Sequence, residues 1–334
     1  MNKTLTIVVP SYNTEKYMDE CLPTMLDAHS IDDIEILLVN DGSKDHTAEK
    51  ALEYQRKYPN SVRVISKENG GHGSVINRGI EEAAGKYFKV IDGDDWVKTE
   101  GLDQLVSELR SSDADLITNP MYVHDLRSGE DTFSDVTHDD SLYGSEHEFE
   151  DVCGKLSGLF IHNITYRTGI LRDNGIKVQE HCYYEDKEFD IYPLPYVQTI
   201  KLLDFPVYVY RVGSGTQSIS KESLLRNKDM HYRILSNLIA YYSNLEGVGD
   251  QTRLFIKKSV DQMMISNYGL FYRLDYGSTA RSMLKDFDKK LRKDFPEYYQ
   301  ESGSKKTNLL RNTTWPIYTV VYLMYRQKRE KRGF

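Results

Sequence analysis

The feature that most restricts the fold is a regular alternation of two patterns over the first 120 residues. Short apolar, β-branched runs typical of buried strands alternate with stretches of helical periodicity. The expected strands are 5–9, 34–39, 62–65, 87–91 and 116–118, and the expected helices are 17–28, 47–58, 74–84 and 101–110. Alternating strands and helices of this length predict an α/β fold with a doubly wound, mostly parallel sheet.

The rest of the chain divides into three stretches. Residues 120–155 lose the periodicity and are rich in Asp, Ser, His and Gly, so we expect an irregular insertion there. Regular structure resumes over about 155–211, and after about residue 220 the pattern is helical throughout. The expected division is therefore a domain at 1–220, with one half at 1–119 and the other at 120–220, followed by a helical C-terminal region at 221–334.

Charge differs sharply between these two regions. Residues 1–220 carry 21 Lys and Arg against 39 Asp and Glu, whereas residues 221–334 carry 22 against 12. The acidic first region argues against nucleic acid as a ligand, because phosphate backbones are bound by basic surfaces. The contrast suggests two modules with different partners.

Cysteine usage and the first residues bear on the compartment. Cys21, Cys153 and Cys182 are too few, and odd in number, for a disulfide framework, and none lies in a CxxC pair. The first thirteen residues hold only a short apolar run before Pro10, unlike the apolar core of a signal peptide. These features predict a reducing, cytoplasmic location.

Three polar clusters each follow directly on an expected strand. They are residues 10–13 (Pro-Ser-Tyr-Asn), 41–43 (Asp-Gly-Ser) and 92–95 (Asp-Gly-Asp-Asp). The carboxyl ends of parallel strands lie along one edge of a sheet, where ligands bind. The three clusters are therefore expected to converge on one pocket.

The cluster at 92–95 gives the most specific indication of function among the three. Three carboxylates in four residues, Asp92, Asp94 and Asp95, repel one another unless a cation is present. Mg²⁺ and Mn²⁺ bind carboxylate and phosphate oxygens together, so a metal that bridges this loop to a diphosphate is the favoured interpretation. The alternative is a solvated acidic turn without function.

Two further features suit a nucleotide. Asp41 can accept hydrogen bonds from a base while Tyr12 stacks on it, although an Asx-turn for Asp41 and a core position for Tyr12 are equally open. Asn69, Gly71 and His72 lie in a glycine-rich loop before a helix, where backbone N–H groups favour phosphate. The loop matches neither the P-loop nor the Rossmann fingerprint.

Taken in order, the motifs resemble those of the family 2 glycosyltransferases, inverting enzymes of the GT-A fold. The resemblance covers about residues 3–220, and the final third matches only loosely. The matching segments are 8–13 (Val-Val-Pro-Ser-Tyr-Asn), 39–43 (Val-Asn-Asp-Gly-Ser) with Asp45, Asn69-x-Gly71, Asn77-x-Gly79, 90–95 (Val-Ile-Asp-Gly-Asp-Asp), Glu185-Asp186-x-x-Phe189, and Tyr210-Arg211 with Ser218-x-Ser220.

The resemblance implies transfer of a sugar from a nucleotide-sugar, with UDP as the expected nucleotide, to a hydroxyl of a glycan, lipid-linked glycan or glycoprotein. Residues 1–119 would bind the nucleotide and residues 120–220 the acceptor. The implied donor-binding residues are Pro10, Tyr12, Asn13, Asp41, Asn69, Gly71, His72, Asp92, Gly93 and Asp94.

Within that set the resemblance assigns Pro10, Tyr12 and Asp41 to the base and Asp92 to the ribose. Asp94, with Asp92, would hold Mn²⁺ or Mg²⁺ on the diphosphate.

On the acceptor side the resemblance implies two catalytic residues, Glu185 and Asp186, with Asp186 as the general base. It also implies that Asp95 and Arg211 face the acceptor. From the residues alone, an Asp that opens a helix also stabilises the helix dipole, and that interpretation stays open. Ile76 stands where the family often has Arg, and His72 in the same loop is a candidate to replace it.

Two other functions compete with glycosyl transfer. A nucleotidyltransferase of similar fold would need a basic, glycine-rich clamp for a triphosphate near the first strand, and the sequence has none there. A non-catalytic scaffold that binds nucleotide-sugars would be free to lose its acidic pairs, yet Asp92 with Asp94 and Glu185 with Asp186 are all present.

The C-terminal tail combines two compositions. Residues 315–325 are an eleven-residue apolar and aromatic run, too short to span a bilayer, and residues 326–332 hold five basic residues and one acid. This composition suits a segment in an anionic membrane interface, on the inner face of the cell membrane. A helix that packs on the body of the protein or pairs two subunits in a homo-oligomer is the equal alternative.

Overall fold

The computed structural model describes residues 3–213, 227–273, 278–302 and 311. The chain forms two compact units, one of Met1–Gln217 with Gly247–Phe255 and the other of Ser218–Glu246 with Ile256–Phe334. The predicted C-terminal tail at 315–334 and the Ser218-x-Ser220 motif lie outside the described residues. Each unit is described separately below.

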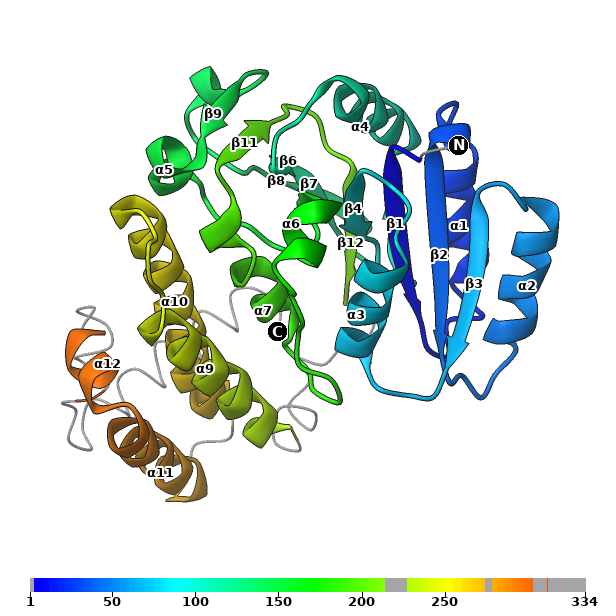
Figure 1. Ribbon diagram of the computed structural model, residues 1–334. Coiled ribbons are helices and arrows are strands. Elements are labelled where there is room, and N and C mark those ends of the chain that lie inside the picture. Colours follow the sequence, from blue (N-terminus) through cyan, green and yellow to red (C-terminus); the bar gives the residue numbers. More distant parts are fainter. Residues whose placement is uncertain (1–2, 214–226, 274–277, 303–310, 312–334) are drawn as a thin grey trace. The chain divides into compact units, whose positions relative to one another are not determined.

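The first unit is built on an eight-stranded sheet in the order β3-β2-β1-β4-β10-β6-β11-β9 (Figure 1). Its strands are β1 (Leu5–Ser11), β2 (Ile34–Asp41), β3 (Val62–Lys67), β4 (Tyr87–Val90), β6 (Leu116–Thr118), β9 (Glu146–Glu148), β10 (Ile164–Arg167) and β11 (Thr199–Leu202). β10 is antiparallel to both β4 and β6, and β9 is antiparallel to β11. The remaining pairs are parallel, which confirms the predicted mostly parallel α/β sheet.

Helices cover both faces of this sheet because side chains on a strand alternate between faces. α1 (Met18–Leu26) and α4 (Thr99–Ser111) share one apolar core with Leu5, Ile7 and Val9 of β1. α3 (His72–Glu82) packs on the opposite face, against Val8. Its Gly79 approaches so closely that an added Cβ would lie 2.4 Å from Val8 Cγ2.

The first two strands extend two residues beyond their predicted ends. In the register of the sheet Pro10 lies opposite Val39 and Ser11 opposite Asn40. The first two polar clusters therefore begin inside the sheet, which fixes the direction in which their following residues leave it.

A second, four-stranded sheet has the order β5-β12-β7-β8. It consists of β5 (Trp96–Val97), β7 (Met121–Asp125), β8 (Glu130–Ser134) and β12 (Tyr208–Val212). The expectation of an irregular insertion at 120–155 is therefore wrong, because this stretch contains β7, β8, β9 and α5 (Phe149–Val152). β8 escaped detection because it is an edge strand whose residues are nearly all exposed, so it carries no apolar alternation.

The first unit also contains the helices α2 (Thr47–Lys57), α6 (Thr168–Asp173) and α7 (Asp186–Ile191). The second unit contains α9 (Lys228–Ser243), most of α10 (Asp250–Arg273), α11 (Ser278–Asp294) and α12 (Pro296–Glu301). Within it tyrosine hydroxyls donate to carboxylates, from Tyr298 to Asp261 at 2.6 Å and from Tyr268 to Asp288 at 2.5 Å. No helix among the residues that the structure describes is both long and apolar enough to cross a membrane.

Candidate active site

Asp41, the last residue of β2, organises the glycine-rich loop between β3 and α3. Its buried carboxylate accepts hydrogen bonds from Lys67 Nζ at 2.6 Å, Gly70 N at 2.9 Å and Gly71 N at 2.8 Å. The side-chain amide of Asn69 donates to Asp41 as well, at 3.1 Å. Both oxygens of Asp41 thus already serve the loop, and its contact with a nucleotide base stays a prediction.

Tyr12 leaves the sheet just beyond β1. Asn13 adopts a left-handed backbone conformation with φ of 54°, which turns the chain outward. Its side-chain oxygen accepts from Lys44 N at 2.9 Å, and its own N–H donates to Ser43 Oγ at 3.1 Å. The turn is therefore fixed, while the Tyr12 ring is 47% exposed at the same edge of the sheet.

Gly93 brings the first and third polar clusters together. A Cβ atom at this position would lie 2.6 Å from the carbonyl oxygen of Pro10 and 3.1 Å from Thr14 Cγ2. Only glycine permits this approach, so the loop 92–95 lies directly against the end of β1. The predicted convergence of these two clusters is present in the structure.

His72 lies between two carboxylates from different elements. Its Nε2 is 2.9 Å from Asp92 Oδ1, at the end of β4, and its Nδ1 is 2.7 Å from Glu185 Oε1, before α7. Burial alone would lower the pKa of His72, but the charges of Asp92 and Glu185 outweigh it and raise the pKa well above its usual value. His72 is therefore an imidazolium whose two N–H groups are both engaged.

This arrangement bears on two expectations. Both ring nitrogens of His72 are engaged by Glu185 and Asp92, and its expected contact with the diphosphate stays a prediction. Glu185, expected beside the catalytic base, has a side chain only 5% exposed and is held by His72. Its carboxylate is a partner of His72, and its expected catalytic role stays a prediction.

Asp95 is also more structural than expected. It is buried, and its two oxygens accept from Tyr208 OH at 2.6 Å and from the backbone N–H of Arg211 at 2.8 Å. Its own N–H donates to Asp92 O at 3.0 Å, which closes the turn. Asp95 therefore ties the acidic loop to β12, and its expected place on the acceptor side stays a prediction.

Arg211 is likewise built into the framework. Its guanidinium carbon lies 4.8 Å from the centre of the Trp96 ring and 5.2 Å from that of Tyr17, and the group pairs with Glu20. Arg211 is only 9% exposed. These contacts pack Arg211 against two aromatic rings, and its expected contact with an acceptor stays a prediction.

The acidic loop contains carboxylates in opposite electrostatic states. Burial alone would raise the pKa of Asp92, but His72 and His162 lower it far below its usual value. Loss of solvation and the charge of Asp92 raise the pKa of Asp94, and burial with the same charge raises that of Asp95. Asp94 is an exposed residue, and its side chain makes no hydrogen bond or ion pair with any other residue that the structure describes.

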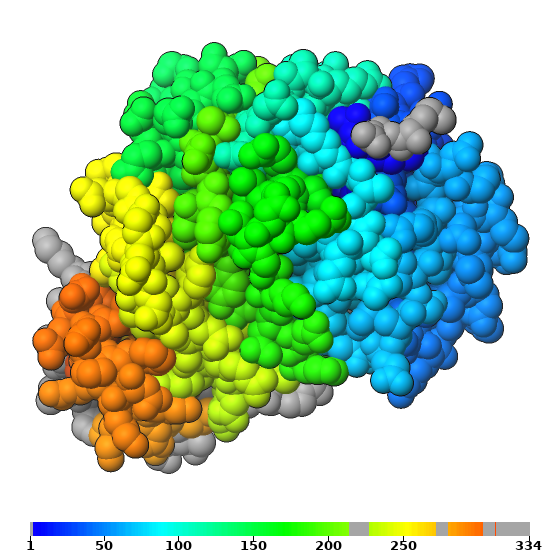
Figure 2. Space-filling model, viewed as in Figure 1, coloured from blue at the N-terminus to red at the C-terminus, as the bar shows by residue number. Residues whose placement is uncertain are grey.

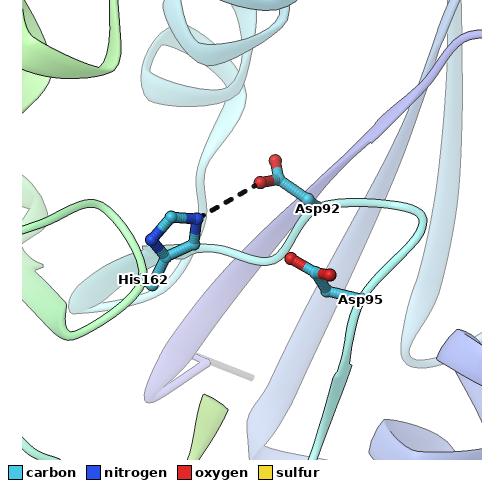
Figure 3. A group of neighbouring side chains, drawn as sticks. All are labelled: Asp92, Asp95 and His162. Atoms are coloured by element: carbon cyan, nitrogen blue, oxygen red, sulfur yellow. Dashed lines mark ion pairs between the residues drawn. The ribbon is translucent and has the colours of Figure 1, made fainter. Parts of the chain in front are cut away.

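A second histidine, His162, lies beside this loop and faces Asp92 (Figure 3). Its Nε2 lies 3.7 Å from Asp92 Oδ2, and Asp92, Asp95 and His162 offer ligand atoms within 4.8 Å of one another. The ring of His162 lies 4.5 Å from that of Tyr210 and 4.9 Å from that of Tyr208. The aromatic contacts hold the imidazole facing Asp92.

Lys89 supports His162 from inside the sheet. Its fully buried ammonium donates to the carbonyl oxygens of His162 at 3.0 Å and Ile164 at 3.1 Å. Burial lowers the pKa of Lys89 to about 7. Neither residue was predicted from the sequence. A lysine inside the apolar strand 87–91 was a readable signal for Lys89, whereas nothing around His162 marks it.

Asp186 is the open carboxylate of the Glu-Asp pair. It is the first residue of α7, and its side chain is 34% exposed. Lys187 Nζ lies 3.6 Å from Asp186 and 2.7 Å from Asp190. Burial alone would lower the pKa of Lys187, but these two carboxylates raise it, so an ammonium group stays beside Asp186.

Comparison with known families gives one match to a family model. The model described as glycosyl transferase family 2 matches residues 6–175, which is half of the chain. The matched region contains every strand-end cluster described above and ends before the Glu185-Asp186 pair.

Curated relatives carry related names. The chain is 26% identical to the glycosyltransferase EpsJ of Bacillus subtilis, over 79% of this chain and 77% of EpsJ. It is 37% identical to the glycosyltransferase GlyG of Streptococcus pneumoniae, over 39% of this chain and 42% of GlyG. It is also 26% identical to the minor teichoic acid biosynthesis protein GgaB of Bacillus subtilis, over 73% of this chain and 27% of GgaB.

Among solved structures, TarS of S. aureus in complex with UDP-GlcNAc has a similar fold. The TM-score is 0.71 at 19% sequence identity, and the match covers 97% of this chain and 92% of the TarS chain.

Proposed function

The chain belongs to the family 2 glycosyltransferases, and we propose that it moves a sugar from a UDP-sugar to an acceptor hydroxyl with inversion at the anomeric carbon. The enzyme class and the GT-A type of fold follow from the family and from the likeness to TarS. The donor, the metal, the base and the acceptor are the subjects of the proposal.

One observation carries the proposal. Asp92, expected on the donor side, and Glu185, which directly precedes Asp186, bind the same imidazole at 2.9 Å and 2.7 Å. An inverting transfer needs a base close to the donor and opposite its leaving group. The shared histidine supports a site in which these two requirements are met by neighbouring elements.

The nucleotide is assigned to the edge formed by β1 and β2. Tyr12 offers an exposed ring there, and Asn69, Gly71 and Gly93 hold the surrounding backbone in place. TarS, which has the same fold, binds UDP-GlcNAc, and this supports UDP as the nucleotide. We place the base against Tyr12 and the diphosphate toward Asp92 and Asp94.

The acidic loop fits a divalent cation. Burial, together with the charge of Asp92, raises the pKa of Asp94 and Asp95, so the loop favours an added positive charge. Asp94 and Asp92 would hold Mn²⁺ or Mg²⁺, and the imidazole of His162 is a further nearby donor. Such an ion, when bound, neutralises the charge of the departing diphosphate.

Asp186 is the proposed general base. As the acceptor oxygen bonds to the anomeric carbon, the bond from that carbon to the diphosphate oxygen breaks, and Asp186 receives the hydroxyl proton. The choice of Asp186 over Glu185 follows from access, because Glu185 is buried and bound to His72.

We infer that the acceptor is a hydroxyl of a bacterial cell-surface glycan or of its lipid-linked precursor. The support is the name of GgaB, a teichoic acid biosynthesis protein that resembles most of this chain. We further propose peripheral membrane contact through residues 315–334, with subunit pairing as its rival. Deleting these residues tests the contact: loss of sedimentation with anionic liposomes supports it, whereas a changed oligomeric state supports pairing.

The function is tested by incubating the protein with a panel of nucleotide-sugars and Mn²⁺. We expect hydrolysis or transfer from one UDP-sugar, and stabilisation of the fold by UDP. Turnover of a nucleoside triphosphate instead, with no effect of any nucleotide-sugar, would contradict the proposal.

A further inference from the structure

We propose that His72 and Glu185 are positioning residues that fix the base Asp186 relative to the acidic loop. We name the chain Asp92–His72–Glu185 the histidine clamp. The proposal rests on the proposed function and adds to it a role for two residues that neither touch substrate nor hold the metal.

The clamp joins three separate elements. His72 is the first residue of α3, Asp92 follows β4, and Glu185 precedes the first residue of α7. The hydrogen bonds of 2.9 Å and 2.7 Å leave the ring no freedom to rotate without breaking one of them. Exposures of 30% for His72 and 5% for Glu185 keep these bonds largely away from water, where charge-assisted bonds are strong.

The surrounding backbone is docked independently of the clamp. His181 N donates to Gly70 O at 2.6 Å, and Asn77 exchanges two hydrogen bonds with the backbone of Val178, both at 2.9 Å. A Cβ on Gly73 would lie 2.2 Å from Gln179 O, so α3 and this segment are in direct contact. Figure 2 shows the two segments, cyan and green, side by side on the surface.

The backbone just before Asp186 adopts an uncommon conformation. His181 and Tyr184 have positive φ values of 51° and 74°, which is uncommon for residues with side chains and has to be held by surrounding structure. Glu185 directly follows Tyr184, and its bond to His72 is the one that lies next to Asp186. The clamp therefore holds Glu185, the residue directly before the base Asp186, at the end of this strained segment.

The consequence is specific to the chemical step. Misplacement of a catalytic group by about 1 Å can cost on the order of 10²-fold in rate. Loss of the Glu185 bond should displace Asp186 while leaving the donor edge at Tyr12 and Asp94 in place. The clamp thus predicts a fall in kcat without a matching rise in the KM of the donor.

The test compares Glu185→Ala, Glu185→Gln and His72→Ala with His181→Asn as a matched control. His181 is an exposed histidine of the same segment, and Asn tolerates its positive φ. In Glu185→Ala we expect kcat to fall about 10- to 100-fold with the donor KM within about threefold. Glu185→Gln keeps an oxygen acceptor for His72 and should recover most of that loss.

Added imidazole should restore part of the kcat lost in His72→Ala and leave the wild type and His181→Asn unchanged. Wild-type kcat in Glu185→Ala, equal impairment of Glu185→Gln, or no imidazole rescue would overturn the clamp. If Glu185→Ala does not fold, the other two results decide the question. A wild-type protein that turns over no nucleotide-sugar would instead overturn the proposed function itself, and the clamp with it.

Discussion

Two acidic sites lie at the same edge of the sheet and differ in how their charge is balanced. Asp41 is buried, yet an ammonium group, a side-chain amide and two backbone N–H groups donate to its single carboxylate. The loop 92–95 crowds three carboxylates together, and the rings of His72 and His162 both face Asp92. Asp94 has no protein partner among the described residues.

A buried carboxylate surrounded by donors is satisfied and holds its loop in place, as Asp41 does for Gly70 and Gly71. The loop 92–95, in which the pKa values of Asp94 and Asp95 are raised, is the one that we propose a cation completes. Removing charge from each site in turn shows whether the two sites differ in this way.

The largest effect is expected at Asp94. Asp94→Ala removes the open carboxylate and should lower turnover by about 10³-fold or more, because a metal ion contributes several kcal/mol to transition-state stabilisation. EDTA should have the same effect on the wild type, with Mn²⁺ restoring the rate. Asp32→Ala is the control, because Asp32 is an exposed aspartate distant in sequence from the acidic loop. Full activity of the chelated enzyme would rule out the cation.

The variant Asp186→Asn tests whether proton removal from the acceptor can be lost while the acidic loop still binds the donor. Asp186→Asn should lower transfer by about 10²- to 10⁴-fold, the usual cost of losing a positioned base. Donor binding, measured by calorimetry with UDP, should persist, and Asp173→Asn serves as the control. A wild-type rate in Asp186→Asn would remove this residue from the mechanism.

Asp41→Asn should act on stability. The amide would place donor hydrogens against the N–H group of either Gly70 or Gly71 and leave Lys67 without its counter-ion. We expect the free energy of unfolding to fall by about 1–3 kcal/mol, the cost of unsatisfied buried groups. Urea denaturation measures this loss. An unchanged midpoint would show that Asp41 does not hold the loop.

The last effect changes no catalytic or loop residue and concerns the buried Lys89 beneath His162. In the folded protein the pKa of Lys89 is lowered to about 7, from an ordinary 10.5. Between these pH values the unfolded chain binds more protons, so the free energy of unfolding rises with pH, by at most about 1.4 kcal/mol per pH unit. Lys89→Met should lack this rise, and the exposed control Lys57→Met should keep it, in thermal melts from pH 7 to about 10. Parallel stability profiles for the two variants would contradict a buried, neutralised Lys89.

The sequence was informative where burial imposes a pattern. The strands at 34–39 and 87–91 were readable because apolar side chains fill both of their faces, and the acidic loop was readable because 92–95 follows one of them. β8 was not, since an exposed edge strand has no apolar face.

Roles within the site were harder to read, because they depend on contacts between distant segments. Glu185 and Asp186 are adjacent acids that only the position of His72 distinguishes. His162 depends on Tyr208 and Tyr210, which follow it by more than forty residues. Such contacts become visible only once the fold brings the segments together.

On the strength of this contrast we propose that the cation and the nucleotide diphosphate bind at the acidic loop and not at Asp41. The decisive measurement is a calorimetric titration of Mn²⁺ into the wild type, Asp94→Ala and Asp41→Asn, each with UDP present. We predict one Mn²⁺ site in the wild type, the same site in folded Asp41→Asn, and none in Asp94→Ala. Equal Mn²⁺ binding by Asp94→Ala and the wild type, or UDP binding that does not depend on Mn²⁺, would contradict this assignment.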